Sequence, residues 1–345
     1  MISFENAQIE GTEVHFLRLP VRIENVIFPL KTMFKMVYIP KIKSLIKSIS
    51  PDILHAHFVT NYGFFGAWCS FNPFVITAWG SDVLNVPEAR LISMVKKLFA
   101  KCALKKADLI TCDAEHVKNA MRILGVAPEK IILVYFGVDT RKFGPGEKSE
   151  ELRVKLGIYD SPTVISLRNL EPLYDIETLI RSLPLVLKEV PESQFLIAGK
   201  GSEEKRLKEL AESLGVSDNV KFVGFIQNDE LPQYLSTVDV YVSTSLSDAG
   251  IAASTAEAMA CGLPVIVTDV ADNKKWVDNG VNGFVVPVKD PKSLAEKIIY
   301  LLQNEDIRKK FGKVNRKIIE ERNNYYKEME KMEDIYKELT RRHEK

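Results

Sequence analysis

The stretch VDVYVSTSLSDAGIAASTAEAMACGLPVIVTD, residues 238–269, carries the strongest information about the fold. Residues 238–243 and 265–268 are apolar, β-branched runs that predict two buried strands. The alanine-rich stretch 254–261 predicts a short helix between them, which Gly262 ends and Pro264 prevents from continuing. A loop that leaves a parallel strand and enters a helix is where α/β proteins bind anions, because unpaired helix N–H groups point outward there.

The start of this predicted helix carries groups suited to a phosphorylated sugar. We expect the backbone N–H groups of Ser254, Thr255 and Ala256 to be available for a phosphate. Glu257 follows them and can accept hydrogen bonds from a sugar hydroxyl. The segment therefore predicts a nucleotide-sugar site.

Composition limits the class of protein. The chain has 345 residues, of which 46% are hydrophobic and 27% are charged, as expected for a globular protein with a sizeable core. Its net charge of +1 gives no electrostatic reason to expect nucleic acid as a partner. The four cysteines lack the spacing of metal ligands and are predicted to be reduced core thiols of a cytoplasmic protein.

Strand and helix patterns alternate along the whole chain, which predicts two Rossmann-like α/β domains with parallel sheets. The turn-rich segment YFGVDTRKFGPGE, residues 135–147, is the best linker candidate. Apolar residues at intervals of three and four predict an amphipathic helix in the tail, which either packs on the protein or binds a partner. The predicted boundaries are 1–137 for the first domain, 138–147 for the linker, 148–312 for the second domain and 313–345 for the tail.

Several motifs in order resemble the retaining glycosyltransferases of family 4. They are HAHF at 55–58, the FGVDTRKF segment, LIAGKGSEEKRLKELAESLGVSDNVKFVGF at 196–225, AEAMACGLPVIVTD at 256–269 and VNGFVVP at 281–287. The resemblance implies a GT-B fold, in which the second domain holds the nucleotide-sugar and the first holds the acceptor, with a cleft between them. It also implies a reaction that needs no metal or other cofactor, since helix N-termini and basic side chains neutralise the diphosphate.

The resemblance assigns the carboxylates. Glu257 matches the second acid of the family's pair, which is expected to bind the ribose hydroxyls. The usual spacing places the first acid at Ala249, whereas the nearest acid here is Asp248. Either the loop has one extra residue and Asp248 contacts the donor sugar, which we favour, or this position has lost its carboxylate and Asp248 only caps a turn.

Other donor-site residues follow from the same resemblance. Arg168 matches the family's phosphate-binding arginine, with a surface ion pair as the alternative. The family's partner lysine is absent, and Tyr174 near that position can donate one hydrogen bond to a phosphate without adding charge. Gly199 and Gly201 form either a simple turn or a point of close phosphate approach, while Val223 and Gly224 belong to a segment whose backbone borders the nucleobase.

In the first domain, His57 resembles the family histidine that approaches the donor sugar and acceptor, whereas His55 is expected to be buried. Trp79 can stack on a sugar face, and Asp82 either accepts acceptor hydroxyls or caps the next segment. We assign Arg168, His57 and Asp248 to catalysis and expect no metal ligands.

The first domain is expected to lack the opening strand–helix unit of the family, because the chain begins with what reads as the second strand. Residues 26–49 mix lysines with large apolar side chains, which fits either peripheral contact with the inner face of a membrane or an ordinary helix. We expect the acceptor to be a sugar, a lipid-linked compound or another small molecule.

Transfer of a sugar from a nucleotide-diphospho-sugar to an acceptor hydroxyl is the predicted function. A catalytically silent nucleotide-sugar-binding protein is one alternative, because the partner lysine is missing and the first carboxylate is displaced. A sugar-nucleotide epimerase of the same fold is another.

Overall fold

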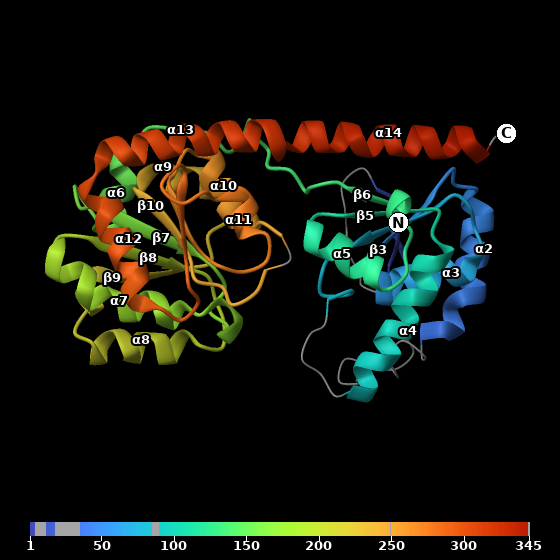
Figure 1. The fold of residues 1–345 in the computed structure, drawn as a ribbon, viewed down its shortest axis with the longest axis horizontal. Coiled ribbons are helices and arrows are strands. Elements are labelled where there is room, and N and C mark those ends of the chain that lie inside the picture. Colours follow the sequence, from blue (N-terminus) through green and yellow to red (C-terminus); the bar gives the residue numbers. More distant parts are fainter. Residues whose placement is uncertain (4–11, 18–34, 85–89, 249, 344–345) are drawn as a thin grey trace. The chain divides into compact units, whose positions relative to one another are not determined.

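The computed structural model describes residues 1–3, 12–17, 35–84, 90–248 and 250–343. The chain separates into two compact units (Figure 1). Unit 1 comprises Met1–Val134 and Lys331–Lys345, and unit 2 comprises Tyr135–Glu330. Each unit contains its own parallel sheet with helices between the strands, so the two predicted Rossmann-like domains are present.

Unit 2 is built on a parallel sheet with the strand order β12-β11-β10-β7-β8-β9 in the described part of the chain. Its strands are β7 (Thr163–Leu167), β8 (Gln194–Ala198), β9 (Val220–Gly224), β10 (Val240–Ser243), β11 (Val265–Thr268) and β12 (Gly283–Val286). The order reverses between β7 and β10, which are neighbours although β8 and β9 lie between them in sequence. A strand-order reversal of this kind is where α/β folds place ligands.

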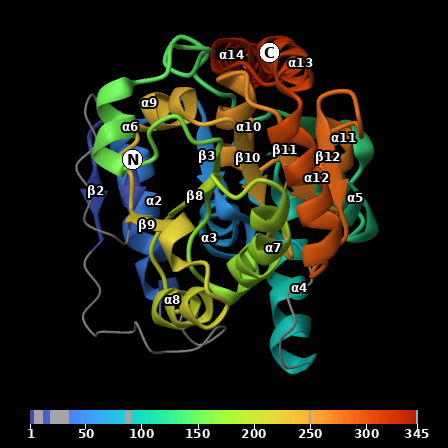
Figure 2. The ribbon, with the colours of Figure 1, turned by 90° about the vertical axis from the view of Figure 1, so that its left-hand side faces the viewer.

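Alternate residues of the central strands face two separate hydrophobic clusters, as expected for a sheet covered on both faces. Val164 of β7 and Ile197 of β8 contribute to one cluster, whereas Ile165 and Leu196 contribute to the other. Helices α7 and α12 supply the first cluster, while α10 supplies the second (Figure 2). The apolar runs in the sequence are therefore long because both sides of each strand are buried.

In the described part of unit 2, a helix separates each pair of successive strands, one helix precedes the first strand and two follow the last. They are α6 (Glu150–Leu156), α7 (Ile176–Glu189), α8 (Glu204–Ser213), α9 (Leu231–Thr237), α10 (Ala253–Ala260), α11 (Asn273–Trp276), α12 (Pro291–Gln303) and α13 (Glu305–Arg322). Helix α10 packs against α13, and α7 packs against α12.

Unit 1 has a parallel sheet of order β3-β4-β5-β6 and, among the described residues, a separate short pair formed by β1 and β2. The strands are β1 (Ile2–Ser3), β2 (His15–Phe16), β3 (Leu54–His57), β4 (Phe74–Ala78), β5 (Leu109–Cys112) and β6 (Ile131–Leu133). The helices are α2 (Ile39–Ile49), the π-helix η2 (Phe58–Gly63), α3 (Phe64–Cys69), α4 (Arg90–Lys106) and α5 (Glu115–Ile123). Within the described residues, no helix combines the length and hydrophobicity needed to span a bilayer.

The segment predicted as a linker, 138–147, lies inside unit 2. Val138 and Phe143 are buried in its core, and the Gly137 backbone contacts Tyr325 so closely that a Cβ atom would lie 2.2 Å from its Cα. The chain therefore passes between the units at Val134–Tyr135, before the predicted linker begins. The turn residues of this segment form a loop that packs against the core of unit 2. The same residue types occur in linkers, so the sequence alone does not distinguish the two.

The tail forms two helices instead of the single one expected. Helix α13 ends at Arg322, and α14 runs from Tyr325 to His343. Two asparagines break the helix by bonding to backbone N–H groups: Asn323 Oδ1 accepts from Gly137 and Asn324 Oδ1 accepts from Tyr326. The far part of α14 packs on unit 1 through Ile335 and Leu339, which contact Val75 and Leu109.

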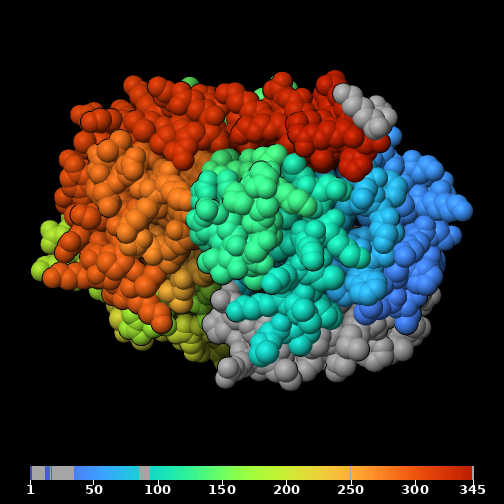
Figure 3. Space-filling model, turned by 45° about the vertical axis from the view of Figure 1, so that its right-hand side comes forward, coloured from blue at the N-terminus to red at the C-terminus, as the bar shows by residue number. Residues whose placement is uncertain are grey.

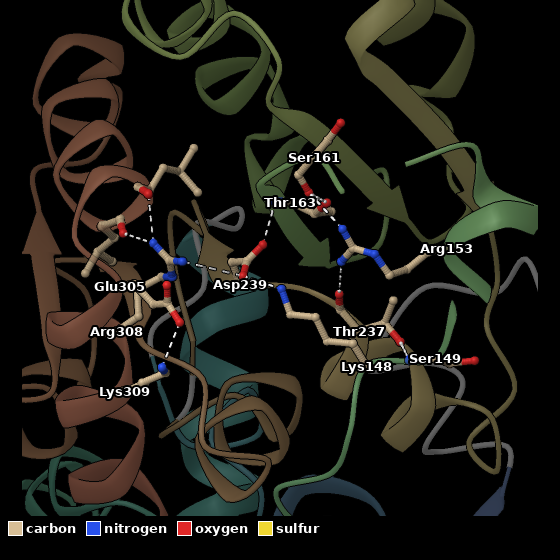
Figure 4. A network of polar contacts seen from close by, with 12 residues as sticks. Lys148, Ser149, Arg153, Ser161, Thr163, Thr237, Asp239, Glu305, Arg308 and Lys309 are labelled. Atoms are coloured by element: carbon tan, nitrogen blue, oxygen red, sulfur yellow. Dashed lines mark hydrogen bonds and ion pairs between the residues drawn. The ribbon is translucent and has the colours of Figure 1, made fainter. Parts of the chain in front are cut away.

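A polar network fixes the edge of unit 2 opposite the carboxyl ends of its strands (Figure 4). Asp239, only 9% exposed, accepts a hydrogen bond from the Thr163 N–H at 2.8 Å and one from Lys148 Nζ at 2.7 Å. Arg153, 3% exposed, donates to the Thr237 carbonyl at 3.1 Å. These bonds satisfy backbone groups at the starts of β7 and β10 that burial would otherwise leave unpaired.

Asp239→Ala is expected to destabilise the protein by about 3 kcal/mol, because it leaves the buried Thr163 N–H group without its acceptor and removes the buried carboxylate that pairs with Lys148 and Arg308. Urea unfolding followed by circular dichroism measures the change. Glu305→Ala provides the control, because Glu305 pairs with Lys309 at an exposed position and its loss should leave the midpoint unchanged. Equal midpoints for the two variants would contradict the stabilising role that we assign to Asp239.

Candidate nucleotide-sugar site

The donor-site residues predicted in unit 2 follow strands that are neighbours in the sheet. Arg168 comes directly after β7, Asp248 follows β10, and α10 begins at Ala253. Since β7 and β10 are paired in parallel, their carboxyl ends lie at the same edge, at the point where the strand order reverses. The fold thus brings together two side chains 80 positions apart in the sequence.

Arg168 and Asp248 form a buried ion pair. The Arg168 Nη2 atom lies 2.5 Å from Asp248 Oδ1, and the two side chains are 10% and 9% exposed. Arg168 Nη1 also lies 3.5 Å from Ser254 Oγ, and the guanidinium carbon is 4.5 Å from the centre of the Tyr174 ring. Burial raises the pKa of the Asp248 carboxyl, while the adjacent guanidinium acts in the opposite direction.

The pair is incompletely satisfied. Arg168 Nε and Asp248 Oδ2 are both buried and have no hydrogen-bond partner among the described residues. Buried polar atoms almost always have partners, and an exception at a strand-order reversal is a reason to expect a ligand there. One unused donor and one unused acceptor are what a phosphate and a sugar hydroxyl need, respectively.

The first turn of α10 is held in place by a tyrosine that sequence reasoning missed. The hydroxyl of Tyr241, a fully buried residue of β10, lies 2.8 Å from Ser254 Oγ and accepts a hydrogen bond from Thr255 at 3.3 Å. The signal was present in the sequence, because a tyrosine inside a buried strand needs a partner for its hydroxyl. No described side chain caps the helix at Ala252.

One of the N–H groups expected at this helix start is not available. The Ala256 N–H donates to the Ala252 carbonyl at 3.0 Å, as the fourth residue of a helix normally does. The backbone groups left for an anion are therefore those earlier in the turn, at Ser254 and Thr255.

Glu257 lies one turn along α10 and is partly buried. Burial raises the pKa of its carboxyl, and Lys142 opposes this effect electrostatically. Lys142 comes from the segment predicted as a linker, and its amino group lies 2.6 Å from Asp229 Oδ1. This cation near the predicted ribose carboxylate was not identified from the sequence, because the FGVDTRKF segment that contains it was interpreted as a linker.

Close packing of two loops accounts for the glycine turn after β8. A Cβ atom on Gly199 would lie 2.4 Å from the Arg168 carbonyl, and one on Gly201 would lie 2.2 Å from the Leu170 carbonyl. The Gly199 N–H donates to the carbonyl of Gly224, at the end of β9 next to the half-buried Val223. These glycines therefore support the loop that carries Arg168, whether or not a phosphate also approaches them.

In unit 1, His57 and Trp79 come together at the ends of β3 and β4, with their ring centres 5.7 Å apart. The surrounding protein lowers the pKa of His57, so its imidazole is neutral at pH 7. His55 has a structural position instead, with Nδ1 2.5 Å from the Tyr336 hydroxyl and Nε2 2.7 Å from Thr77 Oγ1. Burial lowers the pKa of His55 to about 3, which keeps it neutral as well.

Asp82 holds a turn and does not present its carboxylate to an acceptor. The side chain is 6% exposed, with Oδ2 accepting from the Val59 N–H at 2.6 Å and Oδ1 from the Trp79 N–H at 3.0 Å. The bond to Val59 supports Phe58, a residue with a φ of +83° that costs energy outside glycine. Asp82 thus acts indirectly, by fixing the backbone on either side of His57 and Trp79.

Two other expectations concern what surrounds the site. Among the residues with assigned positions, no group of three or more His, Cys, Asp or Glu side chains is arranged to hold a metal ion. In the segment 26–49, residues 26–34 lie outside the described residues, and α2 buries Ile42 and Ile46 in unit 1 while Lys41, Lys43 and Lys47 are exposed.

Comparison with known proteins assigns the family. The model of glycosyl transferases group 1 matches residues 148–318, and the glycosyl transferase 4-like model matches residues 3–114. Spore coat protein SA of Bacillus subtilis is 27% identical over 223 residues, which are 61% of this chain and 59% of the relative. A GDP-mannose-dependent alpha-(1-6)-phosphatidylinositol monomannoside mannosyltransferase of Mycobacterium tuberculosis is 30% identical over 177 residues, covering 49% of this chain and 46% of the relative.

Among solved structures, Anabaena Alr3699/HepE in complex with UDP superimposes with a TM-score of 0.80 and 21% identity over 94% of this chain and 86% of that one. At 21% identity, this similarity shows the fold alone. The match to the Bacillus relative covers 59% of that protein, so about two fifths of the relative's length lies outside the match. The two family models together account for most of both units. The chain belongs to the group 1 glycosyl transferases of family 4, and its two parallel-sheet units have the GT-B fold.

Proposed function

We propose that this protein transfers a sugar from a nucleoside diphosphate sugar to an acceptor hydroxyl, with retention of the anomeric configuration and without a metal ion. The observation that carries the proposal is the buried Arg168–Asp248 pair with one unused donor and one unused acceptor, next to the uncapped start of α10. These groups offer positive charge and N–H donors to a diphosphate and a carboxylate oxygen to a sugar hydroxyl.

The charge that develops during the reaction explains why these groups suffice. When the bond between the sugar C1 and the phosphate oxygen breaks, negative charge builds up on the diphosphate. Arg168 and the N–H groups of Ser254 and Thr255 stabilise that charge from fixed positions in a partly buried site. In this scheme they do the work that a divalent cation does in metal-dependent transferases.

Retention follows if the acceptor attacks from the face that the diphosphate leaves. The acceptor oxygen forms its bond to C1 as the bond to phosphate breaks, and its proton passes to the departing phosphate oxygen. This scheme needs no protein base. His57 and Trp79 are assigned to the acceptor, with the neutral imidazole as a hydrogen-bond partner and the indole as a stacking surface.

The names of similar proteins favour a nucleoside diphosphate donor. The Mycobacterium relative is described as GDP-mannose-dependent, and the Anabaena protein was solved with UDP. Because the two carry different bases, we test both. Backbone atoms at Val223 and Gly224 are assigned to the base, which leaves no side chain to select it.

A thermal-shift screen of UDP-, GDP- and ADP-sugars in the presence of a chelator tests donor binding. At 100 times the dissociation constant, the correct donor should raise the melting temperature by about 5 °C. Glu257→Gln is expected to weaken donor binding about tenfold, since a charged acceptor for the ribose hydroxyls is lost. Glu212→Gln, on the exposed side of α8, should bind as the wild type does.

Turnover is tested separately by following donor hydrolysis and the anomer of the released sugar by NMR. Retained configuration and an unchanged rate after chelation are expected. An inverted product or a requirement for added metal would contradict the scheme. A donor that binds without any turnover, with a range of acceptors present, would instead favour the catalytically silent alternative.

A further inference from the structure

Helix α4 of unit 1 has an unusual composition. Its sequence, RLISMVKKLFAKCALKK, contains six lysine or arginine residues and no acidic residue. The excess extends beyond the helix, because residues 31–106 contain eleven lysine or arginine residues and only three acids. The net charge of +1 for the whole chain therefore conceals a strongly basic region in unit 1.

The described side chains of α4 divide between two faces. Ala100, Ala103 and Leu104 are at most 2% exposed and pack in the core of unit 1. The opposite face is a stripe of exposed residues with a spacing of three to four positions, which we call the α4 stripe: Met94, Lys97, Leu98, Lys101 and Lys105. Residues with this spacing lie on one side of a helix.

The two apolar members of the α4 stripe are exposed to an extent that requires explanation. Met94 is 60% exposed and Leu98 is 65% exposed, although each is flanked by lysines. Single exposed apolar residues are common, but a helical stripe that combines two of them with three cations and no acid is not an ordinary solvated surface. In Figure 3 the atoms of α4, in teal, lie at the surface of the molecule.

We propose that the α4 stripe docks on an anionic phospholipid surface. Lysines attract the negatively charged headgroups, and Met94 and Leu98 enter the boundary between headgroups and acyl chains. A membrane surface accounts for both the lysines and the apolar residues of the α4 stripe. A purely electrostatic partner such as nucleic acid would give no role to Met94 and Leu98. The surface is on α4 and not on α2, where Ile42 and Ile46 face the core of unit 1. This inference does not depend on the proposed reaction.

Co-sedimentation of the full chain with lipid vesicles tests the proposal. The protein should bind vesicles made of equal parts of phosphatidylcholine and phosphatidylglycerol, and should not bind vesicles of phosphatidylcholine alone. Raising the salt concentration should weaken binding, because ions screen the attraction between lysines and headgroups. Equal binding to both vesicles, or no binding to the anionic ones, would overturn the proposal.

Two pairs of substitutions separate the electrostatic contribution of the lysines from the apolar contribution of Met94 and Leu98. Lys97→Glu with Lys101→Glu should lower the partition coefficient at least about 25-fold, because each cation near the surface contributes about fivefold. Met94→Ser with Leu98→Ser should lower it about tenfold while leaving the charge unchanged. Lys97→Gln with Lys101→Gln removes the two charges without reversing them, and it replaces the first pair if charge reversal impairs folding. Its partition coefficient should be about 25-fold lower than that of the wild type.

Matched controls lie on other helices. Lys310→Glu with Lys313→Glu makes the same charge change on exposed positions of α13, and Ile123→Ser removes an apolar side chain that is 87% exposed on α5. The partition coefficients of these variants on the anionic vesicles should stay close to that of the wild type, apart from the small decrease caused by the lower net charge of the first. If they lose as much as the α4 variants, or if the α4 variants bind as the wild type does, the α4 stripe is not the docking surface.

Discussion

Arg168→Ala is expected to lower kcat/KM for sugar transfer about a thousandfold. Removing one fixed donor to a developing anion typically costs a factor of about 100 to 1,000, and Arg168 also provides full positive charge. The substitution has a second effect, because it leaves the Asp248 carboxylate buried without its cation, next to where the diphosphate is assigned. The loss should appear in both kcat and KM, measured by following release of the nucleoside diphosphate.

The double variant Arg168→Ala with Asp248→Asn separates these two effects. Neutralising the unpaired carboxylate should restore much of the stability that Arg168→Ala loses, but not kcat, because the missing cation acts in the transition state. Arg168→Lys keeps the charge without the fork that spans Asp248 and Ser254, and should retain an intermediate rate. A rate within threefold of wild type for Arg168→Ala would disprove the assigned role.

Gly312→Ala is expected to be among the most destabilising single-methyl changes in this protein, at about 3 kcal/mol or more. Gly312 lies in α13, and a Cβ atom there would be only 1.9 Å from the carbonyl oxygen of Gly262, which lies two residues after the end of α10. The obstacle is backbone, so relief requires α13 to move away from the turn that follows α10. Chemical denaturation measures the change in the free energy of unfolding.

Gly215→Ala is the matched control for Gly312→Ala. Gly215 follows α8 with a φ of +69°, and a Cβ atom there would meet nothing within 4 Å. Its substitution should cost about 1 kcal/mol, from the left-handed backbone alone. If Gly312→Ala costs no more than Gly215→Ala, then α10 and α13 are not in rigid contact.

The elements of both sheets were largely predictable from sequence, whereas the partners of particular side chains were not. Runs such as residues 265–268 are apolar throughout, and the glycine and proline after the short helix mark its end, so local patterns are sufficient. The Arg168–Asp248 pair is different, because it depends on how two loops 80 positions apart meet at one sheet edge. Each residue was identified as a site residue, but their pairing required the structure.

The same distinction explains the corrections. Asp82 has the sequence context of a ligand-binding residue and of a turn residue alike, and only the positions of Val59 and Trp79 decide between them. The break between α13 and α14 depends on Asn323 reaching Gly137, a contact with a distant segment that helical periodicity does not reveal. A tyrosine in a buried strand indicates that its hydroxyl has a partner, but only the packing shows that the partner of Tyr241 is Ser254.

Helix α10 is a short, rigid element, so a small rotation about one end displaces the other end. Its eight residues span about 12 Å, with the Gly262–Gly312 contact just beyond the C-terminal end and the turn that we assign to the diphosphate at the N-terminal end. A tilt of about 10° around the contact with α13 would move the N-terminal turn by about 2 Å, which is enough to break its hydrogen bond to Tyr241. We therefore expect substitutions in α13 that loosen its contact with Gly262 to lower donor affinity through α10.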